Sequence, residues 1–319
     1  MSPDSSVLAV KVQGLRKSYG SIAALQGVDF EAPVGAVTAF LGPNGAGKTT
    51  AIRILTGSLL PDAGSVHLFG ADALLSGQDL KKRVGYLPEN NPLWPEMTVE
   101  ETLAFAWSAQ GRVGHKMSAV ERVVVSVGLE PVFRRRIQEC SKGFRQRVGL
   151  AQALIHDPEL VILDEPTNGL DPLQVIQIRE LVRELGRQKT VLLTTHVLPE
   201  VEALADRVVL LHEGEKVVEG TLAEVTSVKA GQQQFKVTVN GSEEDLKSML
   251  ATAGVTRLES GPPSSSAQAQ ASAVVLADGG QGIFEAAVKH DLVLLELTPR
   301  SGTLESLFYG LTQAEGLHV

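Results

Sequence analysis

The sequence of 319 residues contains a single cysteine, Cys140. One cysteine excludes an internal disulfide, and so little cysteine is typical of a reducing compartment. The sequence also lacks any uninterrupted apolar run near the ~18 residues that a membrane-spanning helix needs. No basic segment followed by a long apolar core stands at the N-terminus, so no secretory signal is expected. We therefore expect a soluble, cytoplasmic protein that would reach a membrane only through a partner.

Positive charge is also in deficit. Lysine and arginine total 29 against 37 aspartate and glutamate residues, which gives a net charge of −8 and a pI near 5.5. This balance argues against nucleic-acid binding driven by bulk charge, and no nucleic-acid partner is expected. A local basic patch stays open, although the run Arg134 to Arg136 is more simply a solvated face. The length suggests about two domains, and 43% hydrophobic residues suffice for a sizeable core.

A glycine-rich stretch before residue 50 matches G-x-x-x-x-G-K-[ST], the pattern of a phosphate-binding loop. An apolar, strand-like run from Ala36 to Leu41 precedes it, and a helix-compatible run from Thr50 to Leu55 follows. The motif needs this strand–loop–helix setting, so a turn that binds nothing is the weaker interpretation. The residues predicted to bind a nucleotide here are Gly42, Pro43, Asn44, Gly45, Ala46, Gly47, Lys48, Thr49 and Thr50.

The residue types in this loop suit an anion. Glycine has no Cβ atom, so the backbone can take positive φ and approach a ligand closely. Successive N–H groups then point inward, at the positive end of the following helix. Lys48 adds a mobile charge for the β- and γ-phosphates, the Thr49 hydroxyl can bind Mg²⁺, and Thr50 can hydrogen-bond a phosphate.

Two carboxylates follow the apolar run Leu160 to Leu163, which predicts a strand buried on both faces. They stand at its carboxyl end, where open α/β sheets place their sites. Asp164 is predicted to hold Mg²⁺, directly or through water. Glu165 can reach a water beside the γ-phosphate and act as general base. An isolated Asp-Glu pair is usually a solvated loop, but its place after a buried strand favours the catalytic interpretation.

A second buried strand is predicted from Val191 to Thr195, and His196 follows it. A lone histidine is usually structural. This one is predicted at the same rim as Lys48 and Asp164, so it can sense a γ-phosphate. Tyr19 precedes the phosphate-binding loop at a distance that lets it stack on a base, although a half-buried packing role is as common.

Strand patterns, capping motifs and proline-containing segments elsewhere in the sequence predict further helices, strands and loops. Short strands are expected at Val7 to Val12 and Gly27 to Glu31, and capping boxes are expected to start helices at Thr98 and Ser118. Between Asn90 and Pro95 a loop is expected, whose Leu93 and Trp94 either form a contact surface or fold onto the core. Ser141 and Gly143 open another predicted helix, where a second anion site is a weak signal by itself.

Together these stretches resemble the ATP-binding subunit of an ABC transporter. The resemblance covers about residues 7 to 228 and implies an α/β P-loop NTPase fold with a helical subdomain at about residues 90 to 145. Gly42 to Thr50 correspond to the family's Walker A motif, and Val161 to Glu165 correspond to its Walker B motif. Ser141 to Phe144 stand at the place of the signature, Asn168 to Asp171 resemble the D-loop, and His196 resembles the switch histidine. The sequence of residues 85 to 93 is most similar to that of ABC-2 exporters, especially gliding-motility and multidrug-associated ATPases.

The resemblance implies a mechanism. Two copies face head to tail and bury each ATP between one copy's Walker A and the other's signature, so Ser141, Gly143 and Asp171 would contact nucleotide across a homodimer. ATP closes the pair, hydrolysis to ADP and phosphate opens it, and the motion passes to a membrane permease. The sequence departs from the family at Glu89, where glutamine is usual, and at Lys142 and Phe144. Glu89 can still be a ligand of Mg²⁺ or act in catalysis, but it adds negative charge.

From about residue 229 to 319 the pattern changes to β-α-β-β-α-β, which suggests a small α+β ferredoxin-like domain. Its helix from Ser242 is expected to turn Leu246, Met249 and Leu250 inward. Residues 261 to 272 are small and polar and read as a mobile loop, and Thr303 to Phe308 resemble a tail helix of ABC-2 ATPases. Dimer support, regulation and ligand sensing all stay open for this domain.

Two function classes compete. The first is an ATPase subunit that powers export through a separate membrane protein. The second is a soluble ABC-type switch that acts on a macromolecule without a membrane partner. Such switches usually carry two ATPase halves or a long coiled coil, and this chain has one Walker A and no long heptad run. The transporter interpretation therefore leads, although the membrane link rests on family resemblance.

Overall fold

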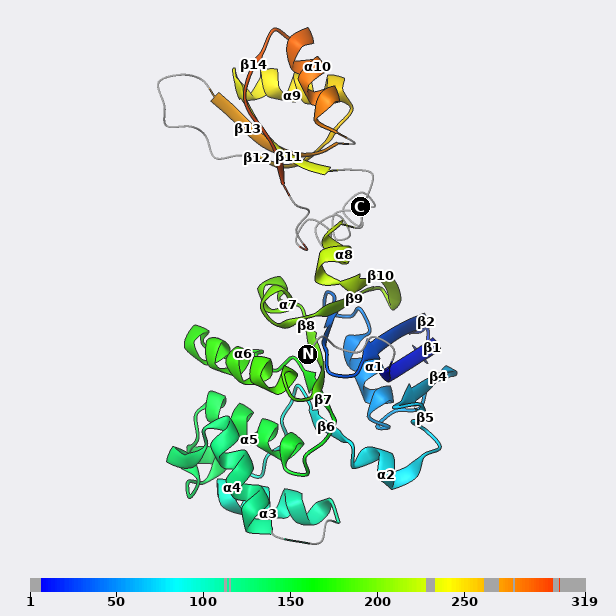
Figure 1. Ribbon diagram of the computed structural model, residues 1–319, viewed down its shortest axis with the longest axis vertical. Helices are drawn as coiled ribbons and strands as arrows, with labels where there is room; N and C mark the ends of the chain where they lie inside the picture. Colours follow the sequence, from blue (N-terminus) through cyan, green and yellow to red (C-terminus); the bar gives the residue numbers. More distant parts are fainter. Residues whose placement is uncertain are drawn as a thin grey trace. The chain divides into compact units, whose positions relative to one another are not determined.

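Apolar strands lie side by side in the centre of the N-terminal part of the chain (Figure 1). The computed structural model describes residues 7–111, 114, 116–227, 233–260, 270–277, 279–300 and 304. The chain divides into two units, Met1–Leu222 and Ala223–Val319. The boundary predicted after residue 228 stays a prediction, because residues 228–232 lie outside the described ranges.

The central sheet of the first unit has six strands in the order β10-β9-β3-β8-β7-β6. Every pair is parallel except β10 with β9, the hairpin predicted around Glu213 and Gly214. All residues of β3, β7 and β8 are buried, which explains their continuous apolar sequence. The strands are β3 (Val37–Leu41), β6 (Val84–Leu87), β7 (Leu160–Asp164), β8 (Thr190–Thr195), β9 (Arg207–His212) and β10 (Glu215–Thr221).

A second, antiparallel sheet has the order β2-β1-β4-β5. Its strands are β1 (Leu8–Tyr19), β2 (Ile22–Pro33), β4 (Ala63–Leu68) and β5 (Ala71–Asp72). The predicted strands Val7 to Val12 and Gly27 to Glu31 were too short, because the polar segment between them continues the hairpin as far as Tyr19 and Ile22. Register shifts along β1 and β2 break the regular alternation that marks a strand in sequence.

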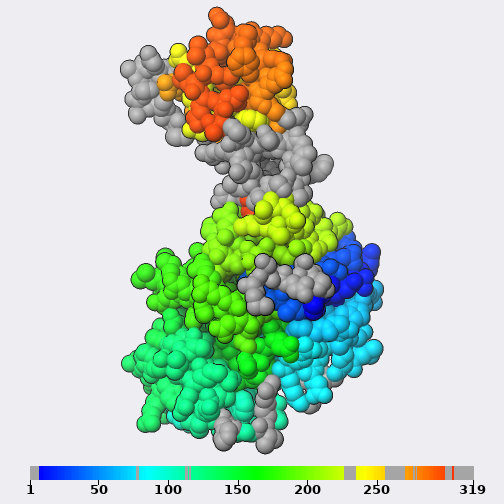
Figure 2. All heavy atoms as spheres, viewed as in Figure 1, coloured from blue at the N-terminus to red at the C-terminus, as the bar shows by residue number. Residues whose placement is uncertain are grey.

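Helix α1 (Lys48–Leu55) packs within the core that the two sheets share. Phe30 of β2 meets Phe40 of β3 edge to face, with ring centroids 4.5 Å apart. In Figures 1 and 2, the region of β1, β2 and β4 lies on one side of the first unit and helices α4, α5 and α6 lie on the other. The central sheet therefore lies between the antiparallel sheet on one side and these helices on the other.

The helical side begins at α3 (Val99–Ala109), where Thr98 and Glu101 form the predicted capping box. The second predicted box was wrong, because α4 (Lys116–Val127) starts before Ser118 and includes it. The valine spacing nevertheless predicted the buried face of α4 correctly, and Gly128 follows the helix at φ 66°. Two short 3₁₀ turns, Glu130–Val132 and Ile137–Glu139, lead to α5 (Lys142–Leu154).

Trp94 does not fold onto the core as one of the two predicted alternatives had it, and the other alternative, a contact surface, stays a prediction. Half of its side chain is exposed, and it packs edge to face on Phe105 of α3 with ring centroids 5.0 Å apart. The two aromatic rings therefore support each other at the surface. The remaining helices of the first unit are α2 (Gly77–Lys81), α6 (Pro172–Gly186) and α7 (Leu198–Leu204); α8 (Leu222–Ser227) begins at the last residue of this unit and otherwise belongs to the second.

The second unit has the predicted β-α-β-β-α-β order. Its elements are β11 (Gln233–Asn240), α9 (Glu243–Ala253), β12 (Thr256–Ser260), β13 (Gln270–Ala277), α10 (Gly280–Lys289) and β14 (Val293–Arg300). The antiparallel sheet has the order β12-β13-β11-β14, and Leu246, Met249 and Leu250 are buried as predicted.

Two predictions for the second unit need comment. The predicted mobile loop was drawn too long, because residues 270–272 belong to β13; residues 261–269 lie outside the described part. The predicted tail helix also lies outside it, apart from Leu304. Across the described ranges, no helix combines the length and apolar character needed to cross a membrane.

Candidate nucleotide site

Four neighbouring parallel strands end at one edge of the central sheet, in the order β3, β8, β7 and β6. The glycine-rich loop follows β3, His196 follows β8, Asp164 ends β7, and Glu89 lies just beyond β6. The carboxyl edge of a parallel sheet is where such folds place ligands. The tertiary structure thus gathers segments that are more than a hundred residues apart in sequence.

The loop uses its glycines in two ways. Gly45 and Gly47 have φ of 87° and 98°, in the left-handed region that favours glycine. Gly42 has an ordinary φ, so the predicted reason was wrong there: a Cβ atom at Gly42 would collide with the carbonyl oxygen of Leu211. Gly47 caps the first turn of α1, whose free N–H groups form an anion-binding end.

Lys48 is buried at the base of this loop, with 6% of its surface exposed. Its ammonium donates hydrogen bonds to the carbonyl oxygens of Gly42 (2.7 Å) and Pro43 (3.1 Å). It also forms an ion pair with Glu165, with Nζ 3.5 Å from Oε1. Both partners are almost fully removed from water, so each charge depends on the other for stabilisation.

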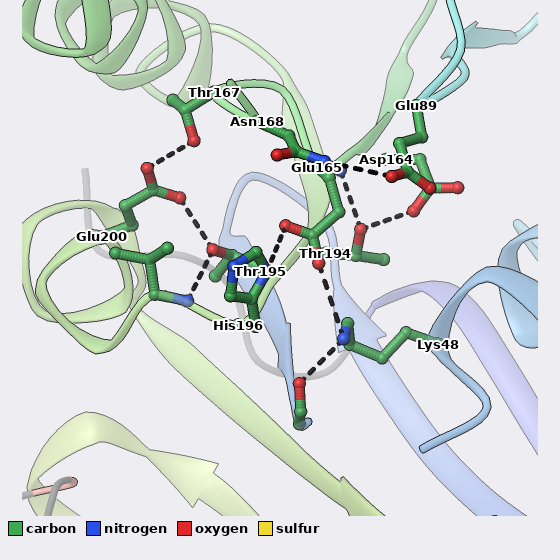
Figure 3. A network of polar contacts seen from close by, with 12 residues as sticks. Lys48, Glu89, Asp164, Glu165, Thr167, Asn168, Thr194, Thr195, His196 and Glu200 are labelled. Carbon is green, nitrogen blue, oxygen red and sulfur yellow. Dashed lines mark hydrogen bonds and ion pairs between the residues drawn. The ribbon is translucent and has the colours of Figure 1, made fainter. Parts of the chain in front are cut away.

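Glu165 connects Lys48 to His196. Its Oε2 lies 2.9 Å from Nδ1 of His196, and its backbone N–H donates to the hydroxyl of Thr194 over 2.9 Å (Figure 3). Its φ of 48° is unusual for a residue with a side chain. Such a conformation persists only where the surroundings fix it, and it often marks a functional site.

Asp164 is buried beside Glu165, and one of its carboxylate oxygens already accepts hydrogen bonds from neighbouring side chains. The Thr194 hydroxyl donates to Oδ1 over 2.6 Å, and the Thr49 hydroxyl lies 3.5 Å from the same atom. Burial raises the pKa of Asp164 above its usual value; the charges of Glu89 and Glu165 raise it further, while the two hydroxyls oppose the shift. Its Oδ2 is buried and has no hydrogen-bond partner.

Glu89 faces the same region from the loop after β6. Its Oε1 accepts a hydrogen bond from Nδ2 of Asn168 over 3.1 Å. Burial, followed by the charge of Asp164, raises the pKa of the neighbouring Tyr86 to about 12. The region therefore holds a concentration of negative charge that attracts a cation.

These groups surround a cavity of about 550 Å³. It is lined by Ala24, Asn44, Gly45, Ala46, Gly47, Lys48, Thr49, Thr50, Glu89, Glu165, Asn168 and His196. The predicted phosphate-loop residues therefore meet Glu89, Glu165 and His196 around one space. Asp164 lies behind this lining, within hydrogen-bond range of Thr49.

Gly42 and Pro43 begin the loop but are not part of this lining, and four residues predicted elsewhere in the chain are also absent from it. Ser141 and Gly143 line a different cavity, next to Phe144 and Gln174. Ser141 caps α5, and Asp171 caps α6 by accepting from the N–H of Gln174 over 3.0 Å. Tyr19 ends β1 with 46% of its surface exposed. Within one chain, these side chains are not brought to the cavity around Lys48.

Sequence reasoning missed several supporting side chains. Thr194 and Thr195 had a recoverable signal, because they directly precede His196 in a predicted buried strand. Asn168 stood in the predicted D-loop but was given no contact. Gln146, which donates from Nε2 to the carbonyl oxygen of Pro166 over 2.9 Å, and the buried Glu200 carried no signal that spacing could reveal.

Comparison with known proteins decides the family. Residues 25–168 match the ABC transporter family. Over 308 residues the chain is 33% identical to an uncharacterized ABC transporter ATP-binding protein of Bacillus subtilis, and the alignment covers 95% of each. The chain belongs to the ABC transporter family, as an ATP-binding subunit.

Other ABC proteins are similar over shorter stretches. The bacitracin transport ATP-binding protein of Bacillus licheniformis is 37% identical over 207 residues, which are 64% of this chain and 67% of that protein. The dimeric, post-hydrolysis structure of an ATP-binding cassette bound to ADP and phosphate superposes with a TM-score of 0.61 and 26% identity, over 67% of this chain and 98% of that one. The predicted P-loop NTPase fold of the ABC type is thus confirmed, and the chain is an ATPase.

Proposed function

We propose that this ATPase powers export across a membrane through a separate permease of the ABC-2 type. The relatives with transport names, including the bacitracin protein, support a transporter role. The resemblance of the sequence of residues 85 to 93 to ABC-2 exporters supports a permease of the ABC-2 type. On this proposal the chain is cytoplasmic and attaches to the inner face of the membrane through its permease, with no nucleic-acid partner.

The cavity around Lys48 is proposed to bind ATP. The backbone N–H groups of Asn44, Gly45 and residues 47 to 50, together with the Lys48 ammonium, would hold the β- and γ-phosphates, because they line the cavity at the start of α1. Tyr19 is proposed to stack on the adenine. Lys48 can leave its contacts with backbone carbonyls at little cost, since a phosphate is a stronger acceptor for its charge.

The residues beside the cavity fit Mg²⁺. Among the described residues, no cluster of three His, Cys, Asp or Glu side chains forms a metal site, but Mg²⁺ usually takes only one or two carboxylates together with phosphates and water. The unpartnered Oδ2 of Asp164 and the nearby Thr49 hydroxyl suit this pattern, with Glu89 as a further ligand. Bound there, Mg²⁺ would neutralise phosphate charge and lower the cost of burying Asp164.

Glu165 is proposed as the general base, and its contacts with both Lys48 and His196 are the observation that carries this proposal. One carboxylate oxygen takes the proton of the attacking water while Lys48 stabilises the phosphate oxygens. His196 orients Glu165 and contacts the γ-phosphate from the end of β8. The products are ADP and phosphate.

Two copies are proposed to close head to tail around ATP. Ser141, Gly143 and Asp171 would then face the nucleotide of the other copy, which is consistent with their absence from the lining of the Lys48 cavity within one chain. Residues 1–228 would form the ATP-binding domain. The second domain, 229–319, would support the dimer, regulate it or sense a ligand.

A soluble ABC-type switch that acts on a macromolecule is the alternative function. Copurification separates the two functions, because only the transporter subunit would bring down a multi-spanning membrane protein. A stoichiometric soluble macromolecule, with no membrane protein, would support the switch instead.

The ATPase proposal is tested by replacing Glu165 with glutamine. Wild type and Glu165→Gln are compared by size exclusion with Mg-ATP, in parallel with ATPase assays. Removal of the base should trap ATP between two copies, so the variant is expected to elute as a dimer and lose turnover. Lys48→Ala serves as a control, because it should neither bind ATP nor dimerise.

Each outcome has a definite meaning. A variant that stays monomeric yet binds ATP would refute closure by two copies alone and would point to the permease or to the altered signature. Retained turnover in Glu165→Gln would refute the assignment of Glu165 as the base.

A further inference from the structure

Glu200 is a buried carboxylate outside the nucleotide cavity. It lies in α7, only 2% of its surface is exposed, and it is not among the residues that line the cavity. Burying a carboxylate is costly unless it is paired and hydrogen-bonded. A residue of this kind therefore needs a reason to be retained inside the protein.

Each of its oxygens accepts a hydrogen bond from a different segment. The hydroxyl of Thr167 donates to Oε1 over 2.5 Å, and the hydroxyl of Thr195 donates to Oε2 over 2.8 Å. The Arg179 guanidinium of α6 adds an ion pair to Oε1 at 3.6 Å. Figure 3 shows the Glu200 carboxylate between the two threonines.

The two threonines adjoin the residues proposed to act on ATP. Thr167 comes two residues after Glu165, and Thr195 comes directly before His196. Because Glu165 and His196 also contact each other over 2.9 Å, three polar contacts and two short backbone segments form a closed ring. The ring runs from Glu165 through Thr167, Glu200 and Thr195 to His196, and returns to Glu165.

The backbone of Glu165 has an unfavourable conformation that the contacts of this ring help to stabilise. Its φ of 48° is unfavourable for a residue with a side chain, and it persists only where neighbouring contacts fix the chain. The Thr194 hydroxyl holds its N–H, and Gln146 holds the next carbonyl group, that of Pro166. The Thr167 contact with Glu200 fixes the same segment one residue further on.

We propose that Glu200 is a positioning residue for ATP hydrolysis, which sets the distance between the segment that carries Glu165 and the segment that carries His196. This inference rests on the roles proposed above for Glu165 and His196. Glu200 acts through these segments and does not touch the nucleotide, so it affects the chemical step and leaves ATP binding unchanged.

The test compares Glu200→Ala and Glu200→Gln with Glu202→Ala, which removes an exposed glutamate from the same helix. In Glu200→Ala, kcat is expected to fall about 10- to 100-fold, since small displacements of reacting groups have effects of this size. KM for ATP should change by less than about twofold, because only the chemical step is affected. Glu200→Gln should lose less, because its amide oxygen can still accept one hydroxyl, and Glu202→Ala should match wild type.

A double-mutant cycle with His196→Ala separates positioning from a general loss of stability. If Glu200 acts through the ring, its replacement should cost little more once His196 is gone. Additive losses, or wild-type kcat in folded Glu200→Ala, would overturn the inference. Should Glu200→Ala fold poorly, Thr167→Val removes one hydrogen bond of the ring with little change in volume and should lower kcat in the same direction; wild-type kcat in that variant would also overturn it.

Failure of the underlying proposal has a different signature. If Glu165→Gln and His196→Ala both keep wild-type turnover, the assigned roles of these two residues are wrong. If both lose turnover while Glu200→Ala keeps it, those roles stand and only the positioning role of Glu200 is refuted.

Discussion

Asn168 donates a hydrogen bond to the carboxylate of Glu89 over 3.1 Å, and so connects the loop after β6 to the segment after β7. Glu89 stands where the family usually has glutamine. A glutamine could accept the same hydrogen bond, so the contact does not require a carboxylate. What the carboxylate adds is charge, since it helps to raise the pKa of Asp164.

The charge of Glu89 is predicted to set the requirement for Mg²⁺. Replacement by glutamine removes one negative charge beside the proposed cation site and keeps the acceptor for Asn168. Glu89 is exposed, so in Glu89→Gln the Mg²⁺ concentration for half-maximal ATPase activity is expected to rise by about threefold to tenfold, the effect of losing a water-screened charge interaction of roughly 1 kcal/mol. Magnesium titrations of ATPase activity check this result.

Asn168→Ala is the matched control for that experiment. It removes the hydrogen bond and leaves the charge of Glu89 in place, so its Mg²⁺ requirement should stay close to that of wild type. An unchanged Mg²⁺ requirement in Glu89→Gln would contradict the role of charge. An equal shift in Glu89→Gln and Asn168→Ala would show that the hydrogen bond between Asn168 and Glu89, and not the charge, sets the Mg²⁺ requirement.

The pair of Lys48 and Glu165 is predicted to be coupled in stability. Lys48→Met leaves the buried carboxylate of Glu165 without its cation, which should lower the free energy of unfolding by about 3 kcal/mol. Adding Glu165→Gln to this variant should restore part of the loss, because no uncompensated charge then remains. Urea unfolding without nucleotide measures the wild type, Lys48→Met, Glu165→Gln and the double variant. Two losses that simply add would show that the charges are not coupled.

Two loop glycines are predicted to differ in tolerance. Ala at position 47 adds a collision with the backbone of Ala24 to the strain of φ 98°, whereas Ala at position 45 meets no atom within 4 Å and faces only the strain of φ 87°. The strain alone costs roughly 1–2 kcal/mol. Gly47→Ala should therefore lower the Tm more than Gly45→Ala, as measured by thermal unfolding without nucleotide. Equal shifts would contradict the steric argument.

The Arg83 and Glu159 pair gives a predicted pH dependence. Two hydrogen bonds, of 2.6 and 2.8 Å, join the guanidinium to the carboxylate, and this contact lowers the pKa of Glu159 below its ordinary 4.5. A lowered pKa contributes stability above the ordinary value and loses it as the pH falls through the native value. Because both side chains are partly exposed, Glu159→Gln should cost less than about 1 kcal/mol at pH 7.

Urea unfolding at several pH values checks that prediction. The difference between wild type and Glu159→Gln should shrink as the pH falls below about 4.5. Glu202→Gln, which changes an exposed glutamate, should show no such trend. A difference that stays constant with pH would contradict an electrostatic origin.

Local sequence predicted those elements whose pattern reflects their environment. Strands β7 and β8 are apolar throughout because both faces are covered, and the valines of α4 recur at helical spacing because one face is buried. The capping box at Thr98 was correct, but the identical pattern at Ser118 fell inside a helix. A capping motif states only a local preference, and packing of the preceding residues can extend a helix past it.

By itself, the sequence determined the fold family and the residue types of the nucleotide site, because a phosphate-binding loop and a carboxylate pair after a buried strand need specific residues at fixed short spacings. Only the tertiary structure decided how those residues meet. The left-handed backbone of Glu165, its joint contact with Lys48 and His196, and the burial of Glu200 all arise between segments far apart in the chain. Such contacts depend on which strands lie side by side, and this order is a property of the whole sheet that local spacing cannot encode.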